Sequence, residues 1–197
     1  DNVNHENKVK AESGNVSCEA KDSYQFVQPK LQKDADNSYT YNTLTQQHLF
    51  GFRLLLQGVQ SDTVTIHEKF DKSRYQINLK SYDNSQLIQV GAGDNDYDAI
   101  NNASAYASHD GAQGFRVVET TDGADIILTG IKTKDGSGTY YNYYAIRYYL
   151  AVRNDAVWKK LRQDAVSDPE HNPERKIFVK NTAEWENLKA DAVNSTY

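Results

Sequence analysis

Residues 139–153 read TYYNYYAIRYYLAVR and hold six of the chain's 14 tyrosines. Side chains of a β-strand alternate between two faces, so this stretch predicts a strand with two unlike faces. The mostly apolar face, which belongs in a core, consists of Tyr140, Tyr144, Ile146, Tyr148, Leu150 and Val152. The opposite face is aromatic and cationic and consists of Tyr141, Tyr143, Ala145, Arg147, Tyr149 and Arg153. Because tyrosine combines a rigid apolar ring with a polar tip, the second face suits contact with a partner.

Two groups of alternating segments extend this pattern. Short polar turns join segments in the first group, which favours a meander of four antiparallel strands. Its segments are 48–57, 63–70, 74–82 and 86–90. The second group joins 115–120, 124–133 and the tyrosine strand through Asp-Gly turns, which are strong hairpin signals. Segment 48–57 also fits a helix, because leucine and glutamine favour helices and apolar residues lie on both of its faces.

Helical spacing of apolar residues occurs in three places. Residues 97–108 predict one helix, and residues from about 156 to 168 predict a second. After a short strand at 176–180, Asn181 or Thr182 is a suitable N-cap for a last helix. The apolar side of that last helix would carry Trp185, Leu188 and Ala192.

Together these patterns predict an α+β fold class in which β-structure dominates. Two antiparallel meanders would form a curved sheet, an open barrel or a sandwich, with the C-terminal helices packed on it. Residues 1–23 are polar and asparagine-rich without apolar periodicity, which predicts a flexible N-terminal arm. Residues 24–197 then form a single globular domain, since that length suits one core.

The amino-acid composition limits the cellular locations and the classes of partner that suit this protein. The 197 residues carry a net charge of -5 and no dense lysine or arginine run, which argues against nucleic acid as a partner. No segment has the roughly 18 consecutive apolar residues of a membrane span. The chain begins at Asp1 without methionine, as after signal-peptide removal, which predicts a secreted, periplasmic or cell-surface protein, of bacterial type. Cys18 is the single cysteine, so no disulfide forms within the chain.

Asp94, Asp96 and Asp98 alternate in a way that resembles the oxygen-rich loops that bind calcium. As an EF-hand loop the segment fails, because Ala99 stands where the glycine belongs and Ala105 where the bidentate glutamate belongs. The alternative is an acidic helix N-terminus, which the helix dipole favours. We therefore expect no cofactor, with calcium at these three aspartates as the alternative.

No catalytic motif is recognisable, which favours a non-enzymatic protein. The leading hypothesis is an extracytoplasmic binding protein, adhesin-like, that contacts a protein or carbohydrate through Tyr141, Tyr143, Arg147, Tyr149 and Arg153. A second hypothesis is a carrier of a small ligand or haem in a β-barrel cavity. A third is a secreted hydrolase or toxin that pairs an aspartate or glutamate with His67 or His109.

Overall fold

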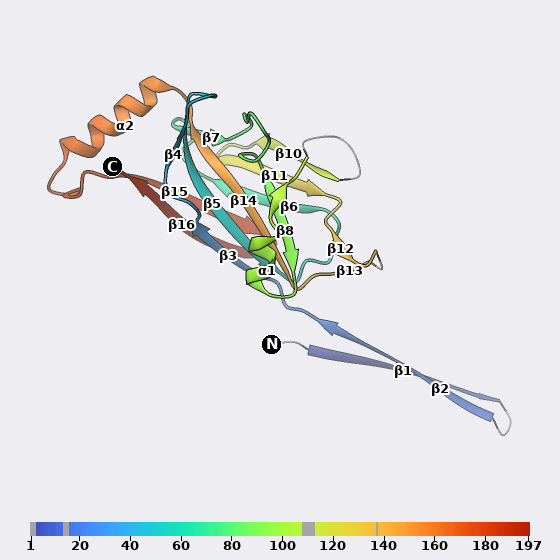
Figure 1. Ribbon diagram of the computed structural model, residues 1–197. Helices are drawn as coiled ribbons and strands as arrows, with labels where there is room; N and C mark the ends of the chain where they lie inside the picture. The colour runs from blue at the N-terminus through green and yellow to red at the C-terminus, as the bar shows by residue number, and fades with distance from the viewer. Residues whose placement is uncertain (1–2, 14–15, 108–112, 137) are drawn as a thin grey trace.

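The computed structural model describes residues 3–13, 16–107, 113–136 and 138–197. Its body is a sandwich of two antiparallel sheets (Figure 1). The five-stranded sheet has the order β10 (Gly114–Glu119), β11 (Gly123–Thr129), β6 (Val64–Lys69), β15 (Ile177–Trp185) and β16 (Leu188–Thr196). The facing sheet has the order β3 (Lys30–Ala35), β5 (Gln47–Gln57), β14 (Tyr143–Val152), β8 (Gln89–Gly93) and β9 (Ser104–Ala105). Within it, β4 (Thr40–Asn42) also pairs with β5, and β7 (Tyr75–Ile77) with β14.

The tyrosine strand, β14, lies in the middle of its sheet between β5 and β8. Its predicted inward face is confirmed, because Tyr144, Ile146 and Tyr148 are each 1% exposed. These side chains pack against inward residues of the other sheet, such as Ile66 and Leu128, and fill the space between the sheets. Burial of large apolar side chains from both sheets is what holds the sandwich together.

The predicted fold class is confirmed: strands dominate, the sheets are antiparallel, and of the three predicted shapes the sandwich is the one found. The strands do not pair in the order expected of two meanders. β5, β6 and β7 follow one another in sequence, yet β6 lies in the opposite sheet from the other two. The hairpin of β10 and β11 does form as expected. Alternation predicts that a strand has one buried face, but it does not say which sheet the strand joins.

The prediction of a last helix after Asn181 is wrong. Residues 177–196 form the hairpin of β15 and β16, with Trp185 opposite Leu188 across a two-residue turn. Within β15 the inward positions are every second residue, and Val179, Ala183 and Trp185 are buried there. This segment is a strand because apolar residues recur at every second position. The three- and four-residue spacing of Trp185, Leu188 and Ala192, which suggested a helix, is not reflected in the structure.

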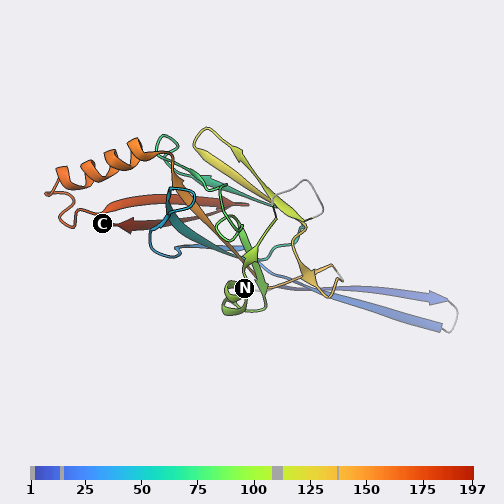
Figure 2. The same cartoon turned by 45° about the horizontal axis from the view of Figure 1, so that its top comes forward.

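The two helices lie at different places on the sandwich. The helix predicted for 97–108 is the shorter α1 (Asp96–Asn101), with Asn95 as its N-cap. It packs against β8 because Gly91 lacks a side chain: a Cβ there would lie 2.0 Å from the carbonyl oxygen of Ala99. The second helix, α2 (Asp155–Ser167), is capped by Asn154 and lies at the opposite end of the body from α1 (Figure 2).

Two short ribbons complete the described chain. β1 (Val3–Ser13) and β2 (Val16–Phe26) pair with each other in a hairpin that projects away from the body (Figures 1 and 2). A separate flexible arm over residues 1–23 stays a prediction. β12 (Thr133–Lys134) and β13 (Thr139–Tyr140) form the small hairpin before β14. Among the described residues, no helix combines the length and the apolar character that a bilayer crossing requires.

Candidate functional site

Four polar side chains meet inside the sandwich, among otherwise apolar neighbours. They are Lys33 of β3, Glu68 of β6, Tyr148 of β14 and Asn181 of β15. The side chains of Lys33 and Glu68 have no exposed surface, and Asn181 is likewise 0% exposed. Lysine and glutamate are almost never fully buried unless they are paired, so this group needs a physical explanation. We call these four residues the core polar cluster.

Strand alternation places the cluster in the interior. Glu68 follows Ile66 on the inward face of β6, and Asn181 follows Val179 on the inward face of β15. Lys33 occupies the buried position of β3, whose other residues are exposed or half-buried. The cluster therefore joins β3 in one sheet to β6 and β15 in the other.

Direct hydrogen bonds connect all four members. The Nζ of Lys33 donates to Oε2 of Glu68 over 2.6 Å and to the hydroxyl oxygen of Tyr148 over 2.5 Å. The Nδ2 of Asn181 donates to the same hydroxyl oxygen over 2.9 Å. Aromatic rings surround the amine, whose nitrogen lies 5.2 Å from the ring centre of Phe52 and 5.1 Å from that of Tyr148.

Burial controls the charge state of the lysine. Desolvation is the largest influence on Lys33 and lowers its pKa, and the attraction of Glu68 opposes this shift without cancelling it. A buried ion pair costs several kcal/mol per ion in lost hydration, on the order of what the pairing returns. Transfer of the shared proton from Lys33 to Glu68 removes both charges at once. The result is a neutral amine with a free electron pair, which is the nucleophilic form of lysine.

Two buried oxygens of the cluster have no hydrogen-bond partner among the described residues, namely Oε1 of Glu68 and Oδ1 of Asn181. Glu68 is opposite Ala183 in the ladder of β6 and β15, so Asn181 is its diagonal neighbour on the same face. An unpartnered buried acceptor costs about 1–3 kcal/mol.

The cluster thus holds an amine, a carboxamide and a carboxyl group in a site buried from the protein surface. The amine and the carboxamide nitrogen share one hydroxyl, which holds them close together. Fixed proximity of reacting groups is worth about 7–11 kcal/mol of an activation barrier. The chemistry that this set of groups supports is attack of the amine on the carboxamide carbon, with the carboxyl group moving the proton.

The predicted contact face lies on the outer side of β14, and its central residues are half-buried. Nε of Arg147 donates to Oδ2 of Asp36 over 2.5 Å, and the Tyr149 hydroxyl accepts from Asn37 over 3.4 Å. Together with Gln89 these residues line a shallow pocket of about 110 Å³.

The remaining residues of the predicted face lie apart from its centre. Tyr143 packs beside Leu55 and Ala99, so α1 covers part of the face. Tyr141 precedes β14 and makes an edge-on contact with the Tyr144 ring. Arg153, beyond the other end of β14, binds the carbonyl oxygen of Lys72. The structure therefore gathers Arg147 and Tyr149 at one pocket and leaves the other three predicted residues along the strand.

The predicted aspartates of the calcium alternative lie at and just before the start of α1. The Asp94 carboxylate contacts the Nζ of Lys134. Oδ2 of Asp98 accepts from Nδ2 of Asn95 over 2.8 Å, and Oδ1 of Asp96 accepts a backbone hydrogen bond from Tyr97. These contacts follow the pattern of an acidic helix N-terminus, and calcium binding there stays a prediction. Of the histidines considered for catalysis, His109 lies outside the described residues.

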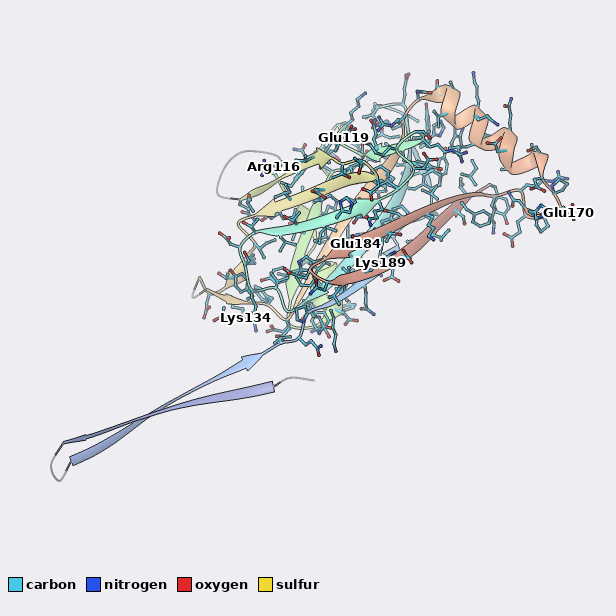
Figure 3. The ribbon with its side chains drawn as sticks, turned by 180° about the vertical axis from the view of Figure 1, so that it is seen from behind. Arg116, Glu119, Lys134, Glu170, Glu184 and Lys189 are labelled. Carbon is cyan, nitrogen blue, oxygen red and sulfur yellow. The ribbon has the colours of Figure 1, made fainter. Side chains whose placement is uncertain are left out.

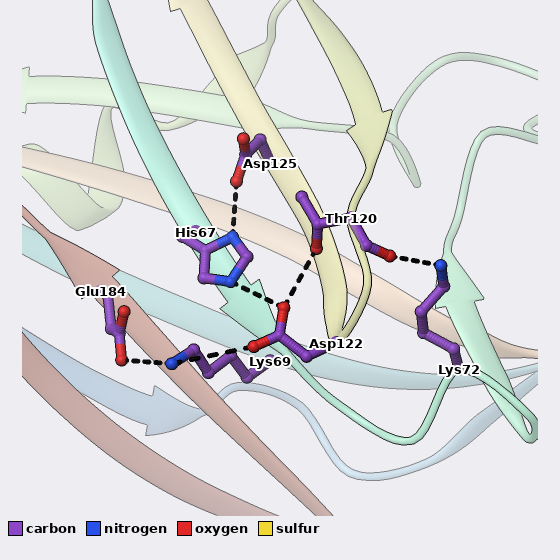
Figure 4. A network of polar contacts seen from close by, with 7 residues as sticks. All are labelled: His67, Lys69, Lys72, Thr120, Asp122, Asp125 and Glu184. Atoms are coloured by element: carbon purple, nitrogen blue, oxygen red, sulfur yellow. Dashed lines mark hydrogen bonds and ion pairs between the residues drawn. The ribbon is translucent and has the colours of Figure 1, made fainter.

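His67 belongs to a polar network on the outer face of the five-stranded sheet (Figure 4). Its Nδ1 lies 2.6 Å from Oδ1 of Asp125 and its Nε2 lies 2.9 Å from Oδ1 of Asp122. The Nζ of Lys69 lies 2.7 Å from Oε1 of Glu184. Figure 3 shows Glu184 and Lys189 on the same side of the molecule. Burial lowers the pKa of His67, but the hydrogen bonds and charges of the two aspartates outweigh it and raise that pKa.

Sequence reasoning missed the core polar cluster. Lys33 and Glu68 received no role, and Asn181 was interpreted as a possible helix N-cap. One signal was present: Glu68 stands at an inward position between Ile66 and Phe70 of an alternating strand. A charged residue at such a position indicates either a buried partner or a functional group.

No family model matches the chain, and no curated protein sequence matches it. Solved structures that overlap with it include the pilus backbone protein RrgB of Streptococcus pneumoniae, at 14% identity and a TM-score of 0.38 over 82% of this chain and 32% of that one. Another is the N-terminal domain of the Streptococcus gordonii adhesin Sgo0707, at 15% identity and a TM-score of 0.39 over 91% and 35%. The chain spans about a third of those proteins. At these values its function has to be derived from its own geometry.

Proposed function

We propose that this chain is a self-crosslinking structural module of a secreted or surface-exposed protein. In this proposal Lys33 and Asn181 react once, within the folded chain, to form an amide bond between their side chains. The observation that carries the proposal is the fully buried lysine amine, hydrogen-bonded to Glu68 and sharing the Tyr148 hydroxyl with the Asn181 carboxamide.

The reaction balances with groups already in the site. The electron pair of Lys33 Nζ attacks Cγ of Asn181, and a new C–N bond forms. Glu68, which already holds the proton of the Lys33 ammonium group, gives that proton up toward Nδ2 and takes a second proton from Nζ, while the bond from Cγ to Nδ2 breaks and ammonia leaves. Glu68 returns to its starting state. The product replaces a buried amine, which is costly to ionise there, by a neutral amide.

A covalent tie at this place suits a load-bearing module. It would join β3 of one sheet to β15 of the other, near the beginning and the end of the body. The chain has one cysteine, so no disulfide within it can supply such a tie. Stability that does not depend on a disulfide and resists force and proteolysis is useful outside the cell, and the polar acidic composition is compatible with that location.

Intact-mass measurement under denaturing conditions tests the proposal. We expect the wild-type chain to be lighter than its sequence by one ammonia, and digestion to yield a branched peptide that joins Lys33 to Asn181. Lys33→Ala and Glu68→Gln should have their full sequence masses. Asparagine can also lose ammonia through cyclisation, so the lysine variant is the decisive control. A wild-type chain at full mass, or an ammonia loss that persists in Lys33→Ala, contradicts the proposal.

A second proposed function is contact with a protein or carbohydrate partner through the outer face of β14. The supporting observation is the pocket at Arg147 and Tyr149, where Arg147 is directly opposite Arg53 in the sheet ladder. The two guanidinium groups flank the Asp36 carboxylate, and their remaining N–H donors favour a ligand that carries carboxylates, such as an acidic sugar.

Binding to a glycan array that includes acidic sugars tests the contact face. We expect Arg147→Ala to weaken binding at least about tenfold, as loss of one charged hydrogen bond would. Arg116→Ala is the matched control, because Arg116 is an exposed arginine of β10 in the opposite sheet. Equal binding by the two variants, or no binding by the wild-type chain, excludes an acidic-sugar role for the pocket.

A further inference from the structure

The Tyr148 hydroxyl contacts both nitrogens that change bonds in the proposed crosslinking reaction. It accepts from Lys33 Nζ, the attacking nitrogen, over 2.5 Å, and from Asn181 Nδ2, the departing nitrogen, over 2.9 Å. Among the described side chains, the hydrogen bonds of Glu68 include Lys33 but not Asn181. The phenol is thus the group that bridges the nucleophile and the leaving group.

The phenol also keeps a proton to give. Its oxygen accepts two hydrogen bonds, which leaves its own O–H to donate, and the Lys33 amine that both groups bind holds the carboxyl group of Glu68 next to it. Burial raises the pKa of the Tyr148 hydroxyl well above its ordinary value, so the hydroxyl stays protonated. Amine, carboxyl group, phenol and carboxamide form one continuous hydrogen-bonded chain.

An amide nitrogen cannot leave as an anion, so the departing Nδ2 has to receive a proton as its bond to Cγ breaks. The proton released by Lys33 arrives first at Glu68, which contacts the attacking nitrogen. A carrier is then needed between Glu68 and Nδ2, and the Tyr148 hydroxyl bonds Nδ2 directly and shares the Lys33 amine with Glu68.

On the premise that the Lys33–Asn181 crosslink forms, we propose that Tyr148 is a catalytic residue that delivers the proton to the departing ammonia. Glu68 starts with the proton that it received from the Lys33 ammonium group. The hydroxyl turns its O–H to Nδ2 and gives up that proton, the proton of Glu68 passes to the phenol oxygen, and Glu68 then takes a second proton from Nζ. One proton moves in total from Nζ to Nδ2. Tyr148 and Glu68 both end as they began.

A matched pair of tyrosine variants tests this role. Tyr148→Phe removes the hydroxyl and keeps the ring. Tyr144→Phe removes an equally buried hydroxyl of the same strand face, which is bonded to the carbonyl oxygen of Lys132 and lies outside the cluster. Full-length chains are made by cell-free synthesis, stopped at timed intervals and weighed under denaturing conditions. We expect crosslinking about 100-fold or more slower in Tyr148→Phe, as for loss of a general acid, and unchanged in Tyr144→Phe.

A second measurement separates proton delivery from mere positioning. Replacing Tyr148 by 3-fluorotyrosine keeps the hydroxyl and its hydrogen bonds but makes the phenol more acidic, so the crosslinking rate should change. This variant also serves if Tyr148→Phe does not fold as well as Glu68→Gln, judged by near-ultraviolet circular dichroism. Wild-type rates in Tyr148→Phe or in the fluorinated chain overturn the role of Tyr148 while the crosslink stands. If the wild-type chain does not crosslink, the proposed function itself fails.

Discussion

At the scale of single residues, the pairing of Lys33 and Glu68 is explained better by reactivity than by stability. A buried ion pair is weak evidence for stability, because apolar residues of similar volume often serve the core as well or better. Removal of one partner from such a pair costs about 3–5 kcal/mol, because the other charge is left alone. The intact pair therefore adds little stability to the unreacted fold, and formation of an amide would replace two costly buried charges by a neutral group.

The histidine on the other side of the same strand gives a prediction on pH. His67 adjoins Glu68 but points outward, where Asp122 and Asp125 bind its two nitrogens and Lys69 and Glu184 complete the network. Its pKa is raised in the folded state, so the histidine holds its proton more tightly when folded than when unfolded. The stabilisation is fully present below the unfolded value of about 6.5 and is lost as the pH rises through the higher folded value.

We therefore expect the melting temperature of the wild-type chain to fall, relative to that of His67→Gln, as the pH rises above 6.5 through the raised pKa. The difference between the two chains isolates His67 from the other titrating groups. It should shrink in high salt, because the network is partly exposed to solvent. A difference that stays constant across this pH range would show that the aspartates do not hold a charged imidazole.

At the scale of elements, alternation predicted the strands well and their partners poorly. The inward face of β14 could be predicted residue by residue, because large apolar side chains recur there at every second position. The division of β5, β6 and β7 between two sheets could not be predicted, because strands of either sheet show the same alternation of buried and exposed residues. Pairing depends on contacts far apart in sequence, which a local pattern does not contain.

The same limit explains why the candidate site was missed. Polar residues at inward positions weaken the apolar pattern that identifies a strand, and Asn181 in β15 favoured the wrong helix assignment. Lys33 lies in a strand whose other residues are exposed or half-buried, so its segment resembled a loop. Each member of the cluster is ordinary in its own segment. The four side chains become a site only in the folded sandwich, which brings together residues from four strands that are far apart in sequence.

At the scale of the whole molecule, the proposed crosslink divides the body into a shielded part and an extensible part. The chain enters the body through β3, beside the projecting hairpin, and the C-terminus lies at the end that carries α2 (Figures 1 and 2). Tension between these ends would pass from Lys33 directly to Asn181. The residues between them would bear none of it, while β16 could still be peeled from β15.

Single-molecule stretching should reveal this division. We expect the wild-type chain, pulled from its two ends, to lengthen only through residues outside 33–181. Glu68→Gln, which cannot move the proton, should release the enclosed residues as well, an added length on the order of 500 Å at about 3.4 Å per residue. In denaturant, the free energy of unfolding of the same variant should be about 5 kcal/mol lower than that of the wild-type chain. This is the stabilisation expected of a crosslink that closes a loop of more than 100 residues in the unfolded chain. Equal extension of the two chains would mean that β3 and β15 are held together only by the packing of the core.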